Sequence, residues 1–165
     1  MNERSLMENT TKILWAVRVL GGVYLLFLLV LFLLWGRNQT YQDIPMADYV
    51  KLFSNYVPFK TTVEQFKMLN AGLINKSIVV SNTIGHILAF IPLGLIMAIG
   101  WKQKWQCHLA IVGFVALLIE MLQLFLRIGS FDVDAILLDV LGYFIGFCFV
   151  YTVNKYLIRK DVHDV

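Results

Sequence analysis

Charged residues are scarce in this chain. Asp, Glu, Lys and Arg together make up 15% of its 165 residues, and 59% of the residues are hydrophobic. Soluble domains average about 25% charged and about 45–50% apolar residues. The net charge of +3 is small and gives no reason to expect a nucleic-acid partner. These proportions argue against a soluble globular protein.

Common signatures of catalysis and metal binding are also missing. The chain has no Gly-rich phosphate loop, no CxxC pair and no HExxH motif. Its two cysteines, Cys107 and Cys148, do not predict a disulfide framework. The sequence shows no internal repeat and no low-complexity tract. It therefore predicts a single unit over residues 1–165, with no cofactor and no metal site.

Long apolar runs are what the chain does contain. A hydrocarbon core about 30 Å thick requires about 20 mostly apolar residues in a helix. Four segments reach this length, at residues 13–35, 78–101, 107–126 and 133–154. The first is too long for the apolar core of a signal peptide, so we expect a retained anchor. The prediction is an all-α, polytopic membrane protein built as a four-transmembrane-helix bundle.

Residues 36–77 connect the first two spans and are too long for a plain loop. Their middle is amphipathic and rich in aromatic residues. After Pro58, Thr61 and Glu64 have the spacing of a capping box, which predicts the start of a short helix. We expect interfacial amphipathic helices that cover one end of the bundle. Their interleaved lysines suit either binding of anionic lipid or a plain solvated surface.

Four spans place both termini on one side of the membrane. That side carries the short basic connection with Lys102 and Lys104, and basic residues also flank the end of the fourth span. By the positive-inside rule, both termini are expected in the cytoplasm. Residues 36–77 and the acidic turn before the fourth span then face outward.

Polar residues gather near the outer ends of the last three spans. A rise of about 1.5 Å per residue places Glu120 and Asp139 roughly 10 Å, and His86 roughly 12 Å, from those ends. Above them lie Asn82, Gln123, Arg127, Asp132 and Asp134. Glu120, Gln123 and Arg127 share one helical face by spacing. Because an ionised group in hydrocarbon costs about 2.5–3.5 kcal/mol, we expect these side chains to converge on an outward-facing polar pocket.

The same residues also allow structural interpretations. Asp132 could cap the fourth span, and Asp134 could favour its first turn. His86, Asn82 and Glu120 could join helices by hydrogen bonds. If the pocket is functional, the catalytic candidates are Glu120, Asp132, Asp134 and His86, and the binding set adds Asn82, Gln123, Arg127 and Asp139. Such groups can bind a divalent metal or act as general acid and base, but their spacing matches no metal motif.

At these residues the sequence resembles the VanZ-like family of small bacterial membrane proteins. The matching positions run in the family's order through most of the chain: Asn55, Pro58, Phe59 and Thr62; Asn82, Gly85, Phe90, Pro92 and Gly94; Glu120 and Gln123; Arg127, Gly129, Ser130, Phe131, Asp132 and Asp134; Gly142 and Gly146. The chain departs from the pattern at Ala135, where the family usually has a second consecutive acid. It also departs at Asp139, where an asparagine is usual, and at His86, where asparagine or another residue is often found.

The resemblance implies a multi-span protein of the bacterial cell membrane, with no established reaction. The family's namesake accompanies glycopeptide resistance and gives low-level resistance to teicoplanin, which carries a lipid tail. We therefore expect a protein that influences susceptibility to lipoglycopeptides, with membrane lipid, a lipoglycopeptide or a lipid-linked envelope precursor as partner. Two alternatives stay open: an intramembrane enzyme acting on a lipid-linked precursor, and a small lipid or solute transporter subunit.

Overall fold

The computed structural model describes residues 3–35, 43–101 and 104–163. Within these ranges the chain forms six helices and two very short strands. Four of the helices are long and apolar enough to cross a membrane: α1 (Glu3–Trp35), α4 (Lys76–Gly100), α5 (Trp105–Phe125) and α6 (Val133–His163). The predicted all-α, four-helix polytopic fold is therefore confirmed.

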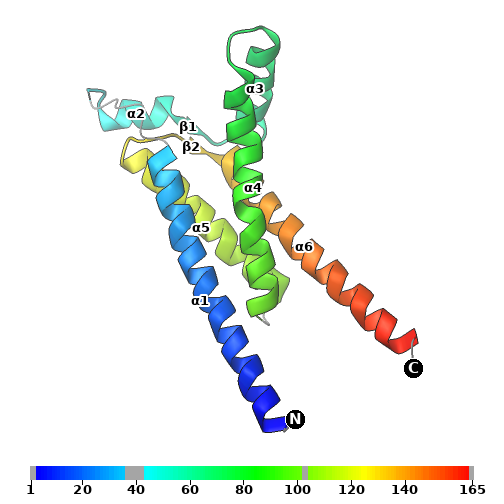
Figure 1. The fold of residues 1–165 in the computed structure, drawn as a ribbon. Coiled ribbons are helices and arrows are strands. Elements are labelled where there is room, and N and C mark those ends of the chain that lie inside the picture. The colour runs from blue at the N-terminus through cyan, green and yellow to red at the C-terminus, as the bar shows by residue number, and fades with distance from the viewer. Residues whose placement is uncertain (1–2, 36–42, 102–103, 164–165) are drawn as a thin grey trace.

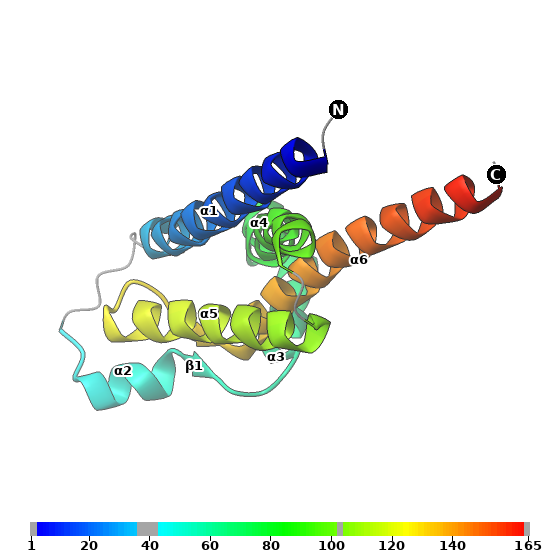
Figure 2. The same cartoon turned by 90° about the horizontal axis from the view of Figure 1, so that it is seen from below.

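The four long helices form a bundle in which α4 is central. Viewed from below, α4 lies between α1 and α6, and α5 lies to one side of α1 and α4 and overlaps the start of α6 (Figure 2). Both chain ends lie at one end of the bundle, and the two shorter helices lie at the other (Figure 1). These are α2 (Met46–Leu52) and α3 (Lys60–Asn70), the short helices expected between the first two spans. Residues 36–42 of that connection lie outside the described part.

The seam between α4 and α6 depends on glycine. A Cβ atom added to Gly142 would lie 2.2 Å from the backbone oxygen of Ile87, and one added to Gly146 would lie 2.2 Å from that of Ile91. On the facing helix, a Cβ at Gly94 would lie 2.1 Å from the oxygen of Tyr143. Backbones this close leave no room for a side chain. The spacing of Gly142 and Gly146 is thus a true close-packing motif.

Large apolar side chains cover the outside of the bundle. Phe27, Phe114 and Phe149 are each more than half exposed, although a compact core that includes Phe90 and Tyr143 is fully buried. In water, apolar surface on every long helix would promote aggregation. In a bilayer it faces lipid, which agrees with four membrane-spanning helices.

A short parallel pairing ties the connecting segment to the end of the bundle. Strand β1 (Ser54–Asn55) pairs with β2 (Phe131–Asp132), with Asn55 opposite Asp132. The backbone N–H of Phe131 also donates to the oxygen of Phe53 at 2.9 Å. This pairing was not predicted from the sequence. It places the start of α3 beside the first turn of α6.

Candidate functional site

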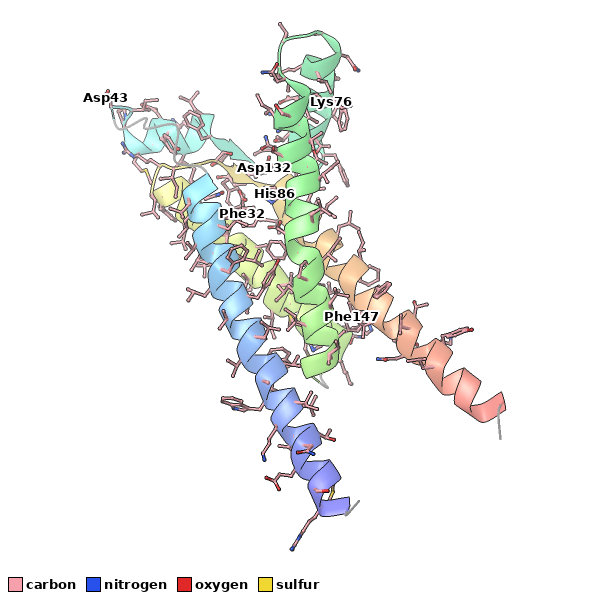
Figure 3. All side chains as sticks on the ribbon, in the orientation of Figure 1. Phe32, Asp43, Lys76, His86, Asp132 and Phe147 are labelled. Atoms are coloured by element: carbon pink, nitrogen blue, oxygen red, sulfur yellow. The ribbon has the colours of Figure 1, made fainter. Side chains whose placement is uncertain are left out.

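A cavity of about 230 Å³ lies where α1, α3, α4, α5 and the start of α6 meet. Six of the predicted site residues line it, contributed by α4, α5, β2 and α6: Asn82, His86, Glu120, Gln123, Asp132 and Asp134. Figure 3 shows His86 and Asp132 near the end of the bundle that carries α2 and α3. Residues that helical rise predicts at a similar depth thus lie around one cavity in the structure.

His86 and Asp139 form a pair between α4 and α6. The Nδ1 atom of His86 lies 2.8 Å from Oδ1 of Asp139, and Asp139 is 1% exposed. Asp139 does not line the cavity itself; it lies behind His86, whose ring does. Since a carboxylate accepts the hydrogen bond, Nδ1 carries the proton and Nε2 is the ring nitrogen left for the cavity.

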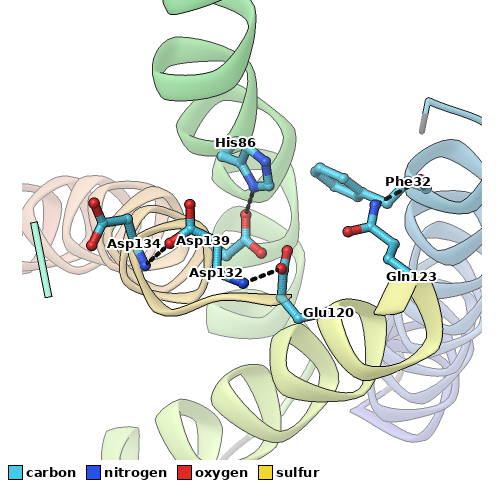
Figure 4. Close-up of polar contacts among 7 residues, drawn as sticks. All are labelled: Phe32, His86, Glu120, Gln123, Asp132, Asp134 and Asp139. Carbon is cyan, nitrogen blue, oxygen red and sulfur yellow. Dashed lines mark hydrogen bonds and ion pairs between the residues drawn. The ribbon is translucent and has the colours of Figure 1, made fainter. Parts of the chain in front are cut away.

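Glu120 supports the acidic turn and faces Asp139. Its Oε2 atom accepts the backbone N–H of Asp132 at 2.8 Å. Figure 4 shows the carboxyl groups of Glu120 and Asp139 pointing toward one another beneath the His86 ring. Glu120 is 2% exposed, and among the described residues its Oε1 atom has no hydrogen-bond partner. Glu120 belongs to the cavity wall, so this oxygen is a polar atom that the described residues leave available to a ligand.

Asp132 caps α6, as one of the structural interpretations expected. Its Oδ1 atom accepts the backbone N–H of Asp134 at 2.9 Å, which is the geometry of an N-cap. The same atom accepts the side-chain amide of Asn55 at 3.0 Å. Asp132 therefore holds β1 and α6 together.

Asp134 binds the start of α3 instead of serving only its own helix. Its Oδ2 atom accepts the backbone N–H of Thr62 at 2.8 Å and the Thr62 hydroxyl at 2.9 Å. Its Oδ1 atom accepts the backbone N–H of Phe59. The free N–H groups at a helix start favour an anion. A carboxylate 72 residues along the chain thus fixes α3 over the cavity.

The capping box predicted at Thr61 and Glu64 is wrong. Helix α3 begins at Lys60, and no side-chain cap bond is made by Phe59 at its N-cap position. The Thr61 hydroxyl instead accepts the Asn55 amide at 3.0 Å. Asp134 of α6 accepts the backbone N–H groups at the start of α3, which is the role expected of a local capping residue.

Helix α1 contributes to the site, although it was expected only as an anchor. The side-chain amide of Gln123 donates to the backbone oxygen of Phe32 at 2.9 Å (Figure 4). Leu31 and Phe32 also form part of the cavity wall. The Gln123 side chain of α5 is thus held by α1, and α1 also contributes apolar groups to the cavity wall.

Arg127 lies outside the cavity. Its guanidinium carbon lies 5.8 Å from the centre of the Tyr49 ring. The prediction placed it on one face with Glu120 and Gln123 by helical spacing, but α5 ends at Phe125. Arg127 has a positive φ of 55°, so the helical period does not extend to it.

Sequence reasoning missed several cavity residues outside the four spans. Thr61, Thr62 and Gln65 of α3 line the cavity together with Ser130 of the acidic turn. Ser81 and Thr83 of α4 were also not singled out. Thr62 and Asn55 belong to the segment that resembles the family pattern, so a signal was present. The capping of α3 from α6 is a long-range contact that no local pattern reveals.

The cavity has the chemistry of a hydrogen-bond acceptor site. Its wall contains three carboxyl groups and one imidazole, and none of the described residues in it is Lys or Arg. Among the described residues, no three His, Cys, Asp or Glu side chains are placed to hold one metal ion. The site can accept hydrogen bonds, and its imidazole can exchange a proton.

Comparison with known protein families gives a match over most of the chain. The model of the VanZ/LLP1 family matches residues 22–154. This range includes part of the first predicted span, all of the other three, and every residue of the cavity wall. No curated protein and no solved structure matches the chain.

Proposed function

The chain belongs to the VanZ/LLP1 family, and we propose that it is a cell-envelope membrane protein whose cavity binds the polar head of a lipid-linked molecule. Through this binding it lowers the susceptibility of a bacterial cell to lipoglycopeptide antibiotics such as teicoplanin. The partners are membrane lipid and either the lipoglycopeptide itself or a lipid-linked envelope precursor.

The observation that carries this proposal is the composition of the cavity wall. The wall combines two kinds of group: carboxyl, amide, hydroxyl and imidazole groups, and the apolar side chains of Leu31, Phe32 and Leu138. A lipid-linked molecule has the same two parts, a polar head joined to an apolar chain. The volume of about 230 Å³ is below the usual range of drug-sized sites, about 300–1,000 Å³, and suits a headgroup better than a whole antibiotic.

The proposed orientation places this cavity at the outer face of the cell membrane. Both termini lie at the opposite end of the bundle (Figure 1), and basic residues at that end favour the cytoplasm by the positive-inside rule. Helices α2 and α3 then form an outer cover, where extracellular glycopeptides meet the membrane.

A susceptibility assay tests the proposal. Wild type, Glu120→Gln and Glu64→Gln are expressed at matched membrane levels in a sensitive Gram-positive host, and growth inhibition by teicoplanin and vancomycin is measured. Glu64 is an exposed acid of α3 outside the cavity wall, so its variant is the matched control. We expect wild type and Glu64→Gln to protect selectively against teicoplanin and Glu120→Gln to lose at least half of that protection. Absence of protection by wild type would overturn the antibiotic function.

The pair of Asp139 and His86 favours a second candidate, an intramembrane enzyme acting on a lipid-linked precursor. A buried carboxylate that fixes Nδ1 of a histidine and leaves Nε2 at a cavity is a common arrangement for a general base. Asp139→Asn separates the two candidates, because it keeps an oxygen near Nδ1 but removes the charge that would stabilise a protonated ring. An enzyme should lose most of its activity in this variant, whereas a binding protein should keep its protection.

A further inference from the structure

The three carboxyl groups of the cavity wall and that of Asp139, which contacts His86, receive different numbers of hydrogen bonds. Asp134 receives three hydrogen bonds from the start of α3. Asp132 receives the N–H of Asp134 at the start of α6 and the amide of Asn55, and Asp139 contacts His86. Glu120 receives only the N–H of Asp132. Oδ2 of Asp139 is also without a partner, but Asp139 does not line the cavity. Glu120 is therefore the acid of the cavity wall that receives the fewest hydrogen bonds, and its Oε1 atom is left for a ligand.

This left-over acceptor is a second observation beside the acidic cluster itself. Glu120 is 2% exposed, it forms part of the cavity wall, and its Oε1 atom has no partner among the described residues. A buried carboxylate oxygen without a hydrogen bond is costly. A ligand that donates a hydrogen bond at this position would remove that cost.

The two positions that could bind an anion are already filled. Helix starts attract phosphate because their N–H groups are free and the helix dipole is positive there. At this cavity, the start of α3 holds the Asp134 carboxylate, and the start of α6 holds the Asp132 carboxylate. No described residue of the wall is Lys or Arg. A phosphate would meet three carboxyl groups and no free cation.

We propose that the cavity binds an ammonium group, the protonated amine of an amphiphile, with Glu120 as its carboxylate partner. The amine donates a hydrogen bond to Oε1 of Glu120, and the apolar chain lies toward Leu31, Phe32 and Leu138. The inference rests on the proposed function, because it names the chemical class of the head that the cavity takes. The amine source is a lipid headgroup or a small free amine.

The test uses the purified full chain in dodecyl maltoside micelles. Its melting temperature is measured with dodecylammonium, dodecyl phosphate or dodecyl glucoside at equal mole fractions, and with short-chain ethylammonium. The proteins are wild type, Glu120→Gln and Glu64→Gln. Gln keeps an oxygen for the N–H of Asp132, so Glu120→Gln is expected to fold, and its melting temperature without ligand verifies this.

Dodecylammonium should raise the melting temperature of wild type and Glu64→Gln, and its apparent affinity should fall at least about tenfold in Glu120→Gln. Dodecyl phosphate should not stabilise the protein. Ethylammonium binding of equal strength would identify a free amine as the ligand, and weaker binding would identify a lipid head; both support an ammonium site. Unchanged affinity in Glu120→Gln, or stabilisation by phosphate, would overturn it.

A second variant supports the same conclusion without removing Glu120. Ser81→Lys adds a tethered amine to the cavity wall, and it should abolish the effect of dodecylammonium in a folded protein. Full binding in this variant would contradict the proposal. If dodecyl glucoside alone binds and its binding depends on Glu120, the proposal of an ammonium ligand is wrong. The proposal that the cavity binds the polar head of a lipid-linked molecule then stands. If no amphiphile depends on Glu120, both are overturned.

Discussion

The carboxyl groups of Asp132 and Asp134 make different contacts although they are two residues apart. Asp132 caps its own helix and holds Asn55, whereas Asp134 caps α3 from another element. Both contacts are structural, so removing either acid would disturb the cavity whether or not it meets a ligand. Glu120 and His86 line the cavity, and among the described residues each keeps one polar side-chain atom without a hydrogen-bond partner. Tests of function are therefore clearest at these two positions.

The contact of Asp139 with His86 should contribute to stability through hydrogen bonding. Asp139→Ala leaves Nδ1 of a half-buried imidazole without its partner, at a cost of about 1–3 kcal/mol in the free energy of unfolding. Asp139→Asn offers a carbonyl oxygen in the same place and should cost less. Unfolding of both variants in mixed micelles with increasing SDS measures the difference. Equal stability of the two variants would contradict a hydrogen-bond role for this contact.

At the residue scale, the sequence was informative where a residue lies inside a regular helix. Helical rise placed His86, Glu120 and Asp139 at one depth, and the structure brings them together. The same arithmetic misplaced Arg127, because the helix ends before it and the backbone turns at φ 55°. Periodicity predicts side-chain position only as far as the helix extends.

Among the elements, the close contact of α4 and α6 sets the shape of the cavity. Gly142 and Gly146 let these helices approach, so that His86 of α4 reaches Asp139 of α6. The sequence indicated this packing face through glycine spacing. It did not indicate which helix would be the partner, since that depends on the whole bundle.

Substitution of Gly146 should therefore separate α4 from α6. A Cβ at Gly146 would lie 2.2 Å from a backbone oxygen of α4, and overpacking of this kind costs about 1–3 kcal/mol. Gly113→Ala is the control, since its Cβ meets nothing within 4 Å and alanine is the better helix former. We expect the melting temperature in detergent to fall for Gly146→Ala and to hold or rise for Gly113→Ala. The reverse order would show that the seam is not tightly packed.

The sequence predicted that the cover made by α2 and α3 is helical. It did not predict the contacts that hold this cover to the start of α6. Hydrophobic spacing revealed two short helices after the first span. Their fixation comes from the pairing of β1 with β2 and from Asp134, contacts between segments more than seventy residues apart. Neither contact has a local sequence signal, because two-residue strands and a side chain that caps a distant helix leave no periodic pattern.

For the whole molecule, the orientation in the membrane decides which side the cavity serves. We expect the α3–α4 connection to lie outside the cell and the α4–α5 connection to lie inside. In a chain whose two cysteines are replaced by serine, Leu73→Cys should react with a membrane-impermeant maleimide on intact cells, because Leu73 is 75% exposed. Lys104→Cys should react only after permeabilisation. The opposite labelling pattern would place the cavity at the cytoplasmic face.

The most direct test of the central claim is to fill the cavity without removing any polar group. Gly85 lies in the cavity wall and Gly113 does not, and both are helical glycines whose added Cβ would meet nothing within 4 Å. We would measure teicoplanin susceptibility of cells expressing Gly85→Leu or Gly113→Leu at matched membrane levels. We expect Gly85→Leu to lose protection and Gly113→Leu to keep it, with both proteins folded. Full protection by Gly85→Leu would show that the cavity is not the functional site.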